Sequence, residues 1–301
     1  MTKQLKSDLM LLLVVLFWGV SYYLMDLSLS EMDPFTLNAF RFIGAFLIAL
    51  IISFPKLKTV SITTIKYSFY IGVSLIFVYI GATFGVLYTS LSNAGFLCAL
   101  TVVFTPIFGY FFKGVLPDKK IIAVVIMCVV GIGLLTLNEQ LKPALGDLLC
   151  LLCAMAYAVD LLITETAVAK IDVNAYQLGV FQLGFAGLFN LILAFVFETP
   201  TLPHAPKVWA AAIFLSIFCT GIAFVIQAVA QQHTSATHVG VIFTLEPVIA
   251  GIVAFAFAGE ILLPRAYLGA GILIAGLIFM EVDFRGKNLQ IPGNILRKSG
   301  K

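Results

Sequence analysis

The chain has 301 residues, of which 61% are hydrophobic and only 11% are charged. Soluble domains carry about 25% charged residues, so this chain lacks the polar surface that two soluble domains of its length would need. The formal net charge of +3 is small, and the placement of the charges is more informative than their sum. The composition indicates a polytopic membrane protein and excludes a nucleic-acid-binding protein, a secreted disulfide scaffold and a cytosolic enzyme.

Polar breaks divide the chain into ten apolar segments of about the length that crosses a bilayer as a helix. In hydrocarbon every backbone polar group must find a partner inside the protein, so each segment is predicted to be a helix. The predicted spans are residues 8–28, 34–54, 66–88, 93–113, 119–137, 146–167, 175–197, 207–230, 236–257 and 265–282. The expected fold class is therefore an all-α integral membrane protein with ten transmembrane helices.

Lysines and arginines between the predicted spans gather on one side. With the N-terminus inside, fourteen of them lie at cytoplasmic ends, and only Lys142, Lys207 and Arg265 lie on the opposite side. Because cytoplasmic loops of membrane proteins are enriched in these residues, we expect a multi-pass protein of the cell membrane with both termini in the cytoplasm.

The two halves of the chain repeat the same landmarks in the same order. Ser7-Asp8-Leu9 opens the first predicted span as Gly146-Asp147-Leu148 opens the sixth, and Pro106 in the fourth span matches Pro247 in the ninth. Five spans is an odd number, so a second copy must enter the membrane from the opposite side. The sequence predicts two inverted five-helix repeats, residues 1–138 and 139–285, followed by a basic cytoplasmic tail, residues 286–301.

Charged side chains within predicted spans are costly and are candidates for function. Arg41 lies about seven residues into the second span, roughly 10 Å below the outer surface at 1.5 Å per residue. It is either a structural residue that pairs with helix ends or extends outward, or an anchor for a substrate carboxylate. Both interpretations stay open at this point.

Glu246 and Asp160 are the two carboxyl groups at mid-membrane depth. Glu246 directly precedes Pro247, which frees a backbone carbonyl one turn earlier, so a bent helix with exposed polar groups is expected there. Glu246 is either a wall of the site or a structural carboxyl that holds the bend. Proton coupling would require one of these two buried carboxyl groups.

Aromatic and amide side chains complete the predicted substrate site. Trp18 is the strongest aromatic candidate, because it lies at mid-depth beside Gly19 and its indole N–H requires a partner. The amides either donate to a polar ligand or join helices. The predicted substrate-binding residues are Trp18, Tyr22, Asn38, Arg41, Tyr79, Tyr157, Asp160, Gln182, Gln227 and Glu246.

The chain resembles the drug/metabolite transporter superfamily, in particular its EamA-type members. The resemblance rests on Thr220–Gln227, Thr234–Thr237, Phe243–Pro247 and Gly259-Glu260 in the second half, and more loosely on Phe17-Trp18-Gly19 and Asp33-Pro34 in the first. It implies ten helices, an inverted repeat and a central cavity lined mainly by spans 1–4 and 6–9. Members move amino acids, drugs, sugars and other metabolites, so the resemblance implies no single substrate.

We therefore expect a secondary transporter that moves small metabolites, with amino acid export as the first hypothesis and efflux of drugs or lipophilic cations as the alternative. An intramembrane enzyme is a weaker alternative, based only on the Gly-x-Ser of Gly19-Val20-Ser21. No catalytic residue, metal ligand or cofactor is expected, and the five cysteines lie in apolar runs as small fillers. The expected partners are a small-molecule substrate and the lipid bilayer, without nucleic acid, and a homodimer stays open.

Overall fold

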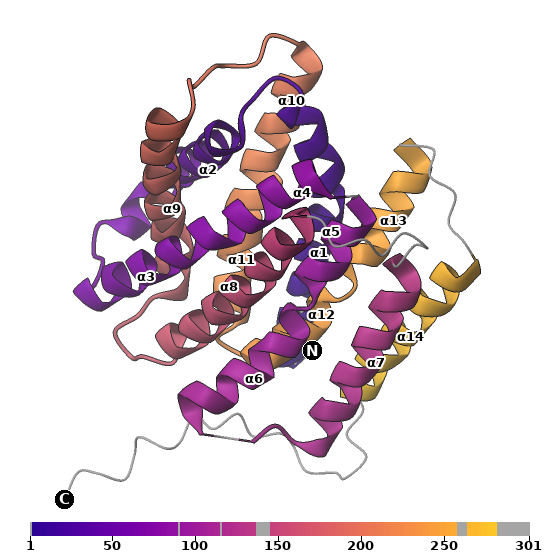
Figure 1. Cartoon of the computed structure of the whole chain (residues 1–301). Helices are drawn as coiled ribbons and strands as arrows, with labels where there is room; N and C mark the ends of the chain where they lie inside the picture. The colour runs from indigo at the N-terminus through magenta and orange to yellow at the C-terminus, as the bar shows by residue number, and fades with distance from the viewer. Residues whose placement is uncertain (1, 90, 115, 137–144, 258–263, 282–301) are drawn as a thin grey trace, which may run out of the picture.

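The computed structural model describes residues 2–89, 91–114, 116–136, 145–257 and 264–281. These residues form helices joined by short connections and contain no strand, as the apolar pattern predicted (Figure 1). Two segments, η1 and η2, are π-helical and are continuous with the α-helices on either side. In chain order the helices are α1 (Lys3–Leu29), α2 (Pro34–Leu57), α3 (Ile62–Tyr79), η1 (Ile80–Phe84), α4 (Gly85–Tyr88), α5 (Leu91–Ala99), α6 (Thr101–Lys113), α7 (Lys119–Thr136), α8 (Leu145–Val168), α9 (Ala175–Phe197), α10 (Pro206–Phe214), η2 (Leu215–Ile222), α11 (Ala223–Ala230), α12 (Ala236–Phe243), α13 (Glu246–Phe257) and α14 (Pro264–Glu281).

Helix is present in each of the ten predicted segments, but not every stretch is long enough to cross a bilayer. Seven stretches among the described residues have the required length and hydropathy: Lys3–Leu29, Pro34–Leu57, Ile62–Tyr88, Leu145–Val168, Ala175–Phe197, Pro206–Ala230 and Ala236–Phe257. Leu97–Lys113 and Tyr267–Met280 are shorter apolar helices. A multi-pass membrane protein is therefore supported, whereas ten spans stays a prediction. The predicted repeat boundary at residue 138 and the tail lie outside the described residues.

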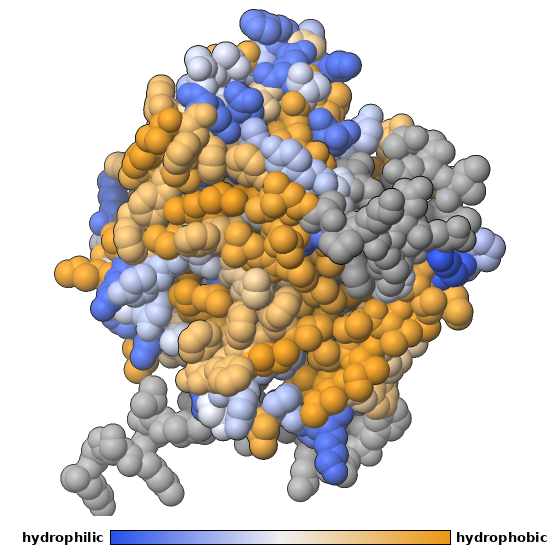
Figure 2. Space-filling view, in the orientation of Figure 1, coloured by the Kyte–Doolittle hydropathy of each residue, from blue (hydrophilic) through white to orange (hydrophobic). Residues whose placement is uncertain are grey.

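The surface of the bundle is apolar over most of its length. Figure 2 shows hydrophobic side chains covering the middle of the visible face, with hydrophilic ones at its upper end and at its left and lower edges. Large aliphatic and aromatic residues on this surface, such as Ile52, Phe111 and Phe195, expose 76%, 74% and 69% of their area. Water-soluble monomers rarely expose contiguous apolar patches above a few hundred Å², so lipid is the solvent that fits this surface.

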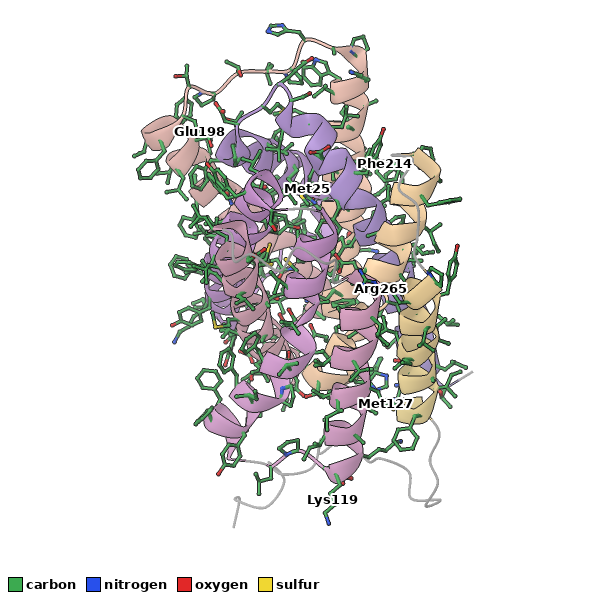
Figure 3. The ribbon with its side chains drawn as sticks, turned by 45° about the vertical axis from the view of Figure 1, so that its right-hand side comes forward. Met25, Lys119, Met127, Glu198, Phe214 and Arg265 are labelled. Atoms are coloured by element: carbon green, nitrogen blue, oxygen red, sulfur yellow. The ribbon has the colours of Figure 1, made fainter. Side chains whose placement is uncertain are left out.

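The two ends of the bundle are distinguished by their charged side chains. Lys119 lies at one end and Glu198 at the other (Figure 3). We call them the lysine end, where α1 begins and α2 and α8 finish, and the glutamate end, where α2 begins and α9 finishes. The sequence predicts that the lysine end faces the cytoplasm.

Helices α2 and α9 pack along their length and are joined at both ends. At the glutamate end, the Glu198 carboxylate accepts hydrogen bonds of 2.8 Å from the backbone N–H groups of Phe35 and Thr36 and from the Thr36 hydroxyl. It thereby satisfies N–H groups that the first turn of α2 cannot pair internally. At the lysine end, the Gln177 amide donates to the carbonyls of Lys56 at 2.8 Å and Thr59 at 3.1 Å. The α2–α9 pair therefore forms a fixed seam.

Small residues allow close approach along this seam. A Cβ atom at Gly187 of α9 would lie 2.8 Å from Ile43 Cγ1 and 2.9 Å from the Ile43 backbone nitrogen of α2. No real side chain fits such contacts unless the helices move apart. Glycine is thus required here for the backbone contact that often holds membrane helices together.

The other main contacts place helices of the second half against those of the first. Helix α7 packs on α14, α3 packs on both α8 and α9, and α6 packs on α8. The central helix α1 packs against α10, η2, α11, α12 and α13. The interior of the bundle therefore lies between the two halves of the chain.

We expect a pH-dependent contribution to stability from Glu31, which lies between α1 and α2 and outside the spans. Its carboxylate accepts hydrogen bonds from the backbone N–H groups of Ala205 at 3.0 Å and His204 at 2.6 Å, just before α10. These two N–H groups lower the pKa of Glu31 from its ordinary value of 4.5. The stabilisation is therefore complete above pH 4.5 and is lost as pH falls through the lowered pKa of the folded state.

The measurement is thermal unfolding of wild type and Glu31→Gln in detergent. At pH 7 the variant should unfold at a lower temperature, and the difference should shrink as pH falls below 4.5. A difference that stays constant with pH would contradict the assignment of this cap.

Candidate functional site

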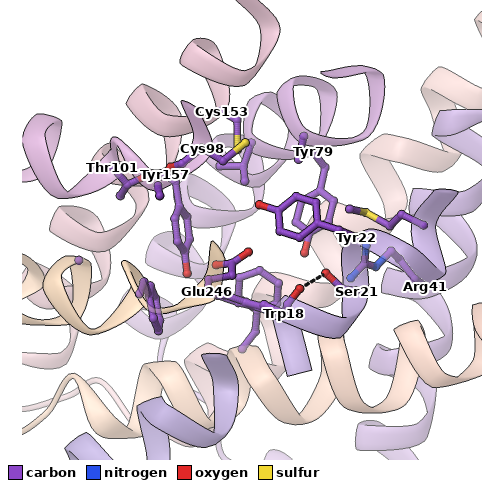
Figure 4. A pocket seen from close by; sticks show the side chains of 17 residues that line it. Trp18, Ser21, Tyr22, Arg41, Tyr79, Cys98, Thr101, Cys153, Tyr157 and Glu246 are labelled. Atoms are coloured by element: carbon purple, nitrogen blue, oxygen red, sulfur yellow. Dashed lines mark hydrogen bonds between the residues drawn. The ribbon is translucent and has the colours of Figure 1, made fainter. Parts of the chain in front are cut away.

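A cavity of about 70 Å³ lies in the centre of the bundle, between the two halves of the chain (Figure 4). A buried water requires roughly 10–15 Å³, so the cavity has room for a few waters or one small solute. Its walls come from α1, α2, α3, η1, α5, α6, α8, α11, α12 and α13. These walls agree with the position that the resemblance implied, except that no residue of α9 contributes.

One face of α1 forms the floor of the cavity. Trp18, Ser21, Tyr22 and Met25 line it together, because residues three or four positions apart lie on the same face of a helix. The Trp18 indole N–H donates to the Cys219 carbonyl at 2.8 Å, in the π-helical segment η2. This bond satisfies the buried donor and fixes the ring against the cavity.

Aromatic rings form a wall beside Trp18. Its ring centroid lies 4.9 Å from that of Phe243 and 5.6 Å from that of Tyr157, both in edge-to-face geometry. Tyr157 and Phe243 are nearly parallel, with an interplanar angle of 11°. Such rings bind apolar groups, and their faces attract cations.

Arg41 reaches the cavity from α2 and is 1% exposed, so its side chain does not extend to an end of the bundle. Its Nε donates to the Thr220 hydroxyl of η2 at 2.7 Å, and its guanidinium carbon lies 4.8 Å from the centre of the Tyr79 ring. Its Nη1 has no hydrogen-bond partner among the described residues. A guanidinium that is held on one side and free on the other can donate hydrogen bonds to a carboxylate.

Glu246 reaches the cavity from the first turn of α13. The ninth predicted span is interrupted at Thr244 and Leu245, between α12 and α13. This interruption ends two residues before Pro247, which agrees with the bend expected from the proline. The carboxylate thus lies at a helix N-terminus in the middle of the bundle, where the helix dipole favours negative charge. In Figure 4 it points among Trp18, Tyr22 and Tyr157.

The two charged groups of the cavity are not paired with each other. Among the described residues the ion pairs are Lys113–Glu165 and Asp8–His238, so neither Arg41 nor Glu246 takes part in one. The cavity therefore presents one cationic and one anionic side chain, separated by aromatic rings. A molecule that carries both charges could meet both groups.

The structure brings six of the ten predicted substrate-binding residues to this cavity and places four elsewhere. Those that line it are Trp18, Tyr22, Arg41, Tyr79, Tyr157 and Glu246. Asn38 accepts a 3.1 Å hydrogen bond from the Thr83 hydroxyl of η1 and joins two helices. Gln227 accepts a 2.7 Å bond from the Tyr157 hydroxyl, behind the cavity wall. Asp160 and Gln182 are buried at 1% and 2% exposure, away from the cavity lining.

Several lining residues were missed because nothing in their chemistry distinguishes them. Cys98, Thr101, Cys153, Phe224 and Phe243 are ordinary residues of an apolar helix, and only the fold brings them together. For Ser21 and Met25 a signal was present, since both share a helix face with Trp18.

Known proteins resemble this chain in sequence and in fold. The model of the EamA-like transporter family matches residues 5–137 and again residues 144–282. An uncharacterized transporter of Archaeoglobus fulgidus is 30% identical over 281 residues, which cover 93% of this chain and 87% of the relative. The uncharacterized transporter YoaV of Bacillus subtilis is 24% identical and is covered to 95%. A solved crystal structure with 17% identity superposes with a TM-score of 0.75 over 92% of this chain and 96% of that chain, which shows a shared fold.

Proposed function

Since the chain belongs to the EamA-like transporter family, we propose that it exports amino acids or closely related metabolites across the cell membrane by alternating access. Family membership supports a transporter rather than an enzyme. The export direction rests on the family resemblance, and the amino acid rests on the cavity.

The observation that carries the substrate class is the pair of separate charges in one small cavity. The free Nη1 of Arg41 suits a carboxylate, and Glu246, within aromatic rings, suits an ammonium group. An α-amino acid carries both groups on one carbon atom. Sites for drug-sized ligands measure about 300–1,000 Å³, so a 70 Å³ cavity favours a small metabolite.

Alternating access is supported by the way the two halves pack. Contacts between helices recur when each helix is replaced by the helix at the same position in the other half, that is, α1 by α8, α3 by α11 and α6 by α13. The contact of α3 with α8 corresponds to that of α1 with α11, and the contact of α6 with α8 corresponds to that of α1 with α13. Such exchange is expected of two inverted repeats that enclose a site and rock against each other. The two separate family matches support the same division.

Efflux of a lipophilic cation is the second candidate, because Glu246 lies beside Trp18, Tyr157 and Phe243. Aromatic rings around a carboxylate are typical of cation sites. Arg41 in the same cavity argues against it, since a buried positive charge repels a cation that has no carboxylate to offer.

Transport into proteoliposomes of purified protein tests the proposal with three matched compounds: an amino acid, the amine that lacks its carboxylate, and the acid that lacks its amino group. We expect saturable exchange of the amino acid and weak competition by the other two. Better transport of the amine than of the amino acid would favour the cation carrier and overturn the amino acid proposal. Cells that produce the protein should also release the amino acid faster than cells without it.

A further inference from the structure

We infer that Asp160 forms a second site, separate from the substrate cavity, which binds a monovalent cation, H⁺ or Na⁺, whose movement is coupled to transport. This inference rests on the proposed function, because it assigns the driving ion of the same carrier. It concerns a residue that the substrate site leaves unused.

Asp160 lies deep in α8 and is only 1% exposed. The Gln227 amide lies against its carboxyl group, but neither carboxyl oxygen has a well-formed hydrogen bond among the described residues. An ionised carboxylate in the membrane interior, with only a neutral amide beside it, costs far more free energy than that contact offsets. A buried carboxyl group of this kind requires a bound cation, and the smallest cations are a proton and a sodium ion.

Neutral oxygen groups accompany the carboxyl group. Thr164 follows Asp160 by one helical turn on the same face of α8, is 1% exposed, and its hydroxyl also has no partner in the described part of the chain. Gln227 of α11 lies beside Asp160. Carboxylate and hydroxyl oxygens are groups that bind hard cations, and the carboxylate alone suffices for a proton.

No positively charged side chain in the described part of the chain takes the place of such a cation. Among the described residues, Lys113 of α6 pairs with Glu165, and Arg41 bonds to Thr220 and lies over Tyr79. The elements packed against α8 carry the titratable groups Lys66, Tyr67, Tyr70 and Tyr79 of α3, Tyr88 of α4, Cys98 of α5, Tyr110 and Lys113 of α6 and His238 of α12, besides Asp147, Cys150, Cys153, Tyr157 and Glu165 of α8 itself.

A direct contact chain joins Asp160 to the substrate cavity. The Tyr157 ring lines the cavity, and its hydroxyl donates to Gln227 Oε1 at 2.7 Å, so Gln227 contacts both sites. The backbone of Asp160 lies only three residues from that of Tyr157, roughly 4.5 Å along the helix. Binding at one site can therefore change the orientation of Gln227 and of the Tyr157 ring at the other.

Buried polar groups continue from Asp160 towards the lysine end. The Gln227 amide donates to Gln231 at 3.3 Å, and Gln231 donates to the Leu161 carbonyl at 3.1 Å. Beyond them, Asp8 and His238 form a buried pair at 3.2 Å where α1 and α12 begin. The cation site therefore has polar neighbours on the side that the sequence predicts to face the cytoplasm.

Exchange and accumulation in proteoliposomes distinguish the coupling site from the substrate site. Exchange of labelled amino acid needs no ion gradient, whereas accumulation does. An imposed tenfold gradient of the coupled cation should concentrate substrate up to about tenfold for one-to-one coupling. We expect Asp160→Asn to exchange at nearly the wild-type rate and to lose accumulation under both H⁺ and Na⁺ gradients. The matched control, Asp26→Asn, changes an exposed carboxylate of α1 and should keep both activities.

Full accumulation by Asp160→Asn, or wild type that exchanges substrate but responds to neither gradient, would overturn the inference. Which gradient drives wild type identifies the cation.

A second measurement does not depend on the substrate. The full chain in detergent is treated with dicyclohexylcarbodiimide, which modifies buried protonated carboxyl groups, and modification of Asp160 is quantified by mass spectrometry. Modification that rises as pH falls supports a proton, and modification that Na⁺ suppresses supports sodium. Modification that depends on neither, or that does not occur, would overturn the cation site even if the substrate proposal holds.

Discussion

Replacement of Arg41 by alanine is expected to abolish saturable transport of amino acids. The variant removes the one guanidinium that lines the cavity, whose Nη1 has no partner within the described residues. A hydrogen bond to a charged group contributes about 1.5–3 kcal/mol, so affinity should fall about 10- to 150-fold. The half-saturation concentration for exchange measures this loss. A rise of this size places saturation beyond the substrate concentrations that the assay can use.

Two further variants separate ligand binding from folding, since Arg41 also holds Thr220 of η2 at 2.7 Å. Arg41→Lys keeps the charge but replaces the planar fork of the guanidinium with donors on a single nitrogen, and should lose an intermediate part of the affinity. Thr220→Val removes only the structural partner, and should affect thermal stability more than affinity. Wild-type affinity in a folded Arg41→Ala protein would remove Arg41 from the substrate site.

The helices were predictable from the sequence because hydropathy alone decides which segments can enter a bilayer. Breaks within the helices were less predictable. Pro247 does coincide with a break between α12 and α13, but Pro106 lies inside α6, and the break in that segment occurs six residues earlier at Leu100. A proline removes one backbone hydrogen bond, and neighbouring helices decide whether the helix opens there.

The position of a residue along its helix could be predicted from the sequence, whereas the direction of its side chain could not. Arg41 and Asn38 lie one turn apart on α2, yet Arg41 lines the cavity and Asn38 bonds to Thr83 of η1. Gln182, predicted as a substrate-binding residue, lies on α9, which packs against α2 and α3 and contributes nothing to the cavity lining. Helix rotation depends on contacts between distant segments, and the local sequence does not record them.

Glu246→Gln is expected to change the selectivity of the carrier rather than only its rate. The substitution preserves the shape of the side chain and removes the negative charge from the cavity, which retains Arg41. Affinity for the amino acid should fall at least about tenfold, because an ammonium group loses its charged partner. Affinity for the matched acid without an amino group should stay unchanged or rise, because a repelling carboxylate is gone. Competition against labelled amino acid in proteoliposomes measures both.

The selectivity change also separates Glu246 from Asp160. If Glu246 binds the substrate ammonium and Asp160 binds the driving cation, Glu246→Gln should still respond to an ion gradient with whichever substrate it retains. Asp160→Asn should show the reverse, with the selectivity of wild type and no accumulation. A Glu246→Gln protein that loses accumulation while it binds the amino acid as wild type does would assign the coupling cation to the cavity and leave the ammonium group without a partner.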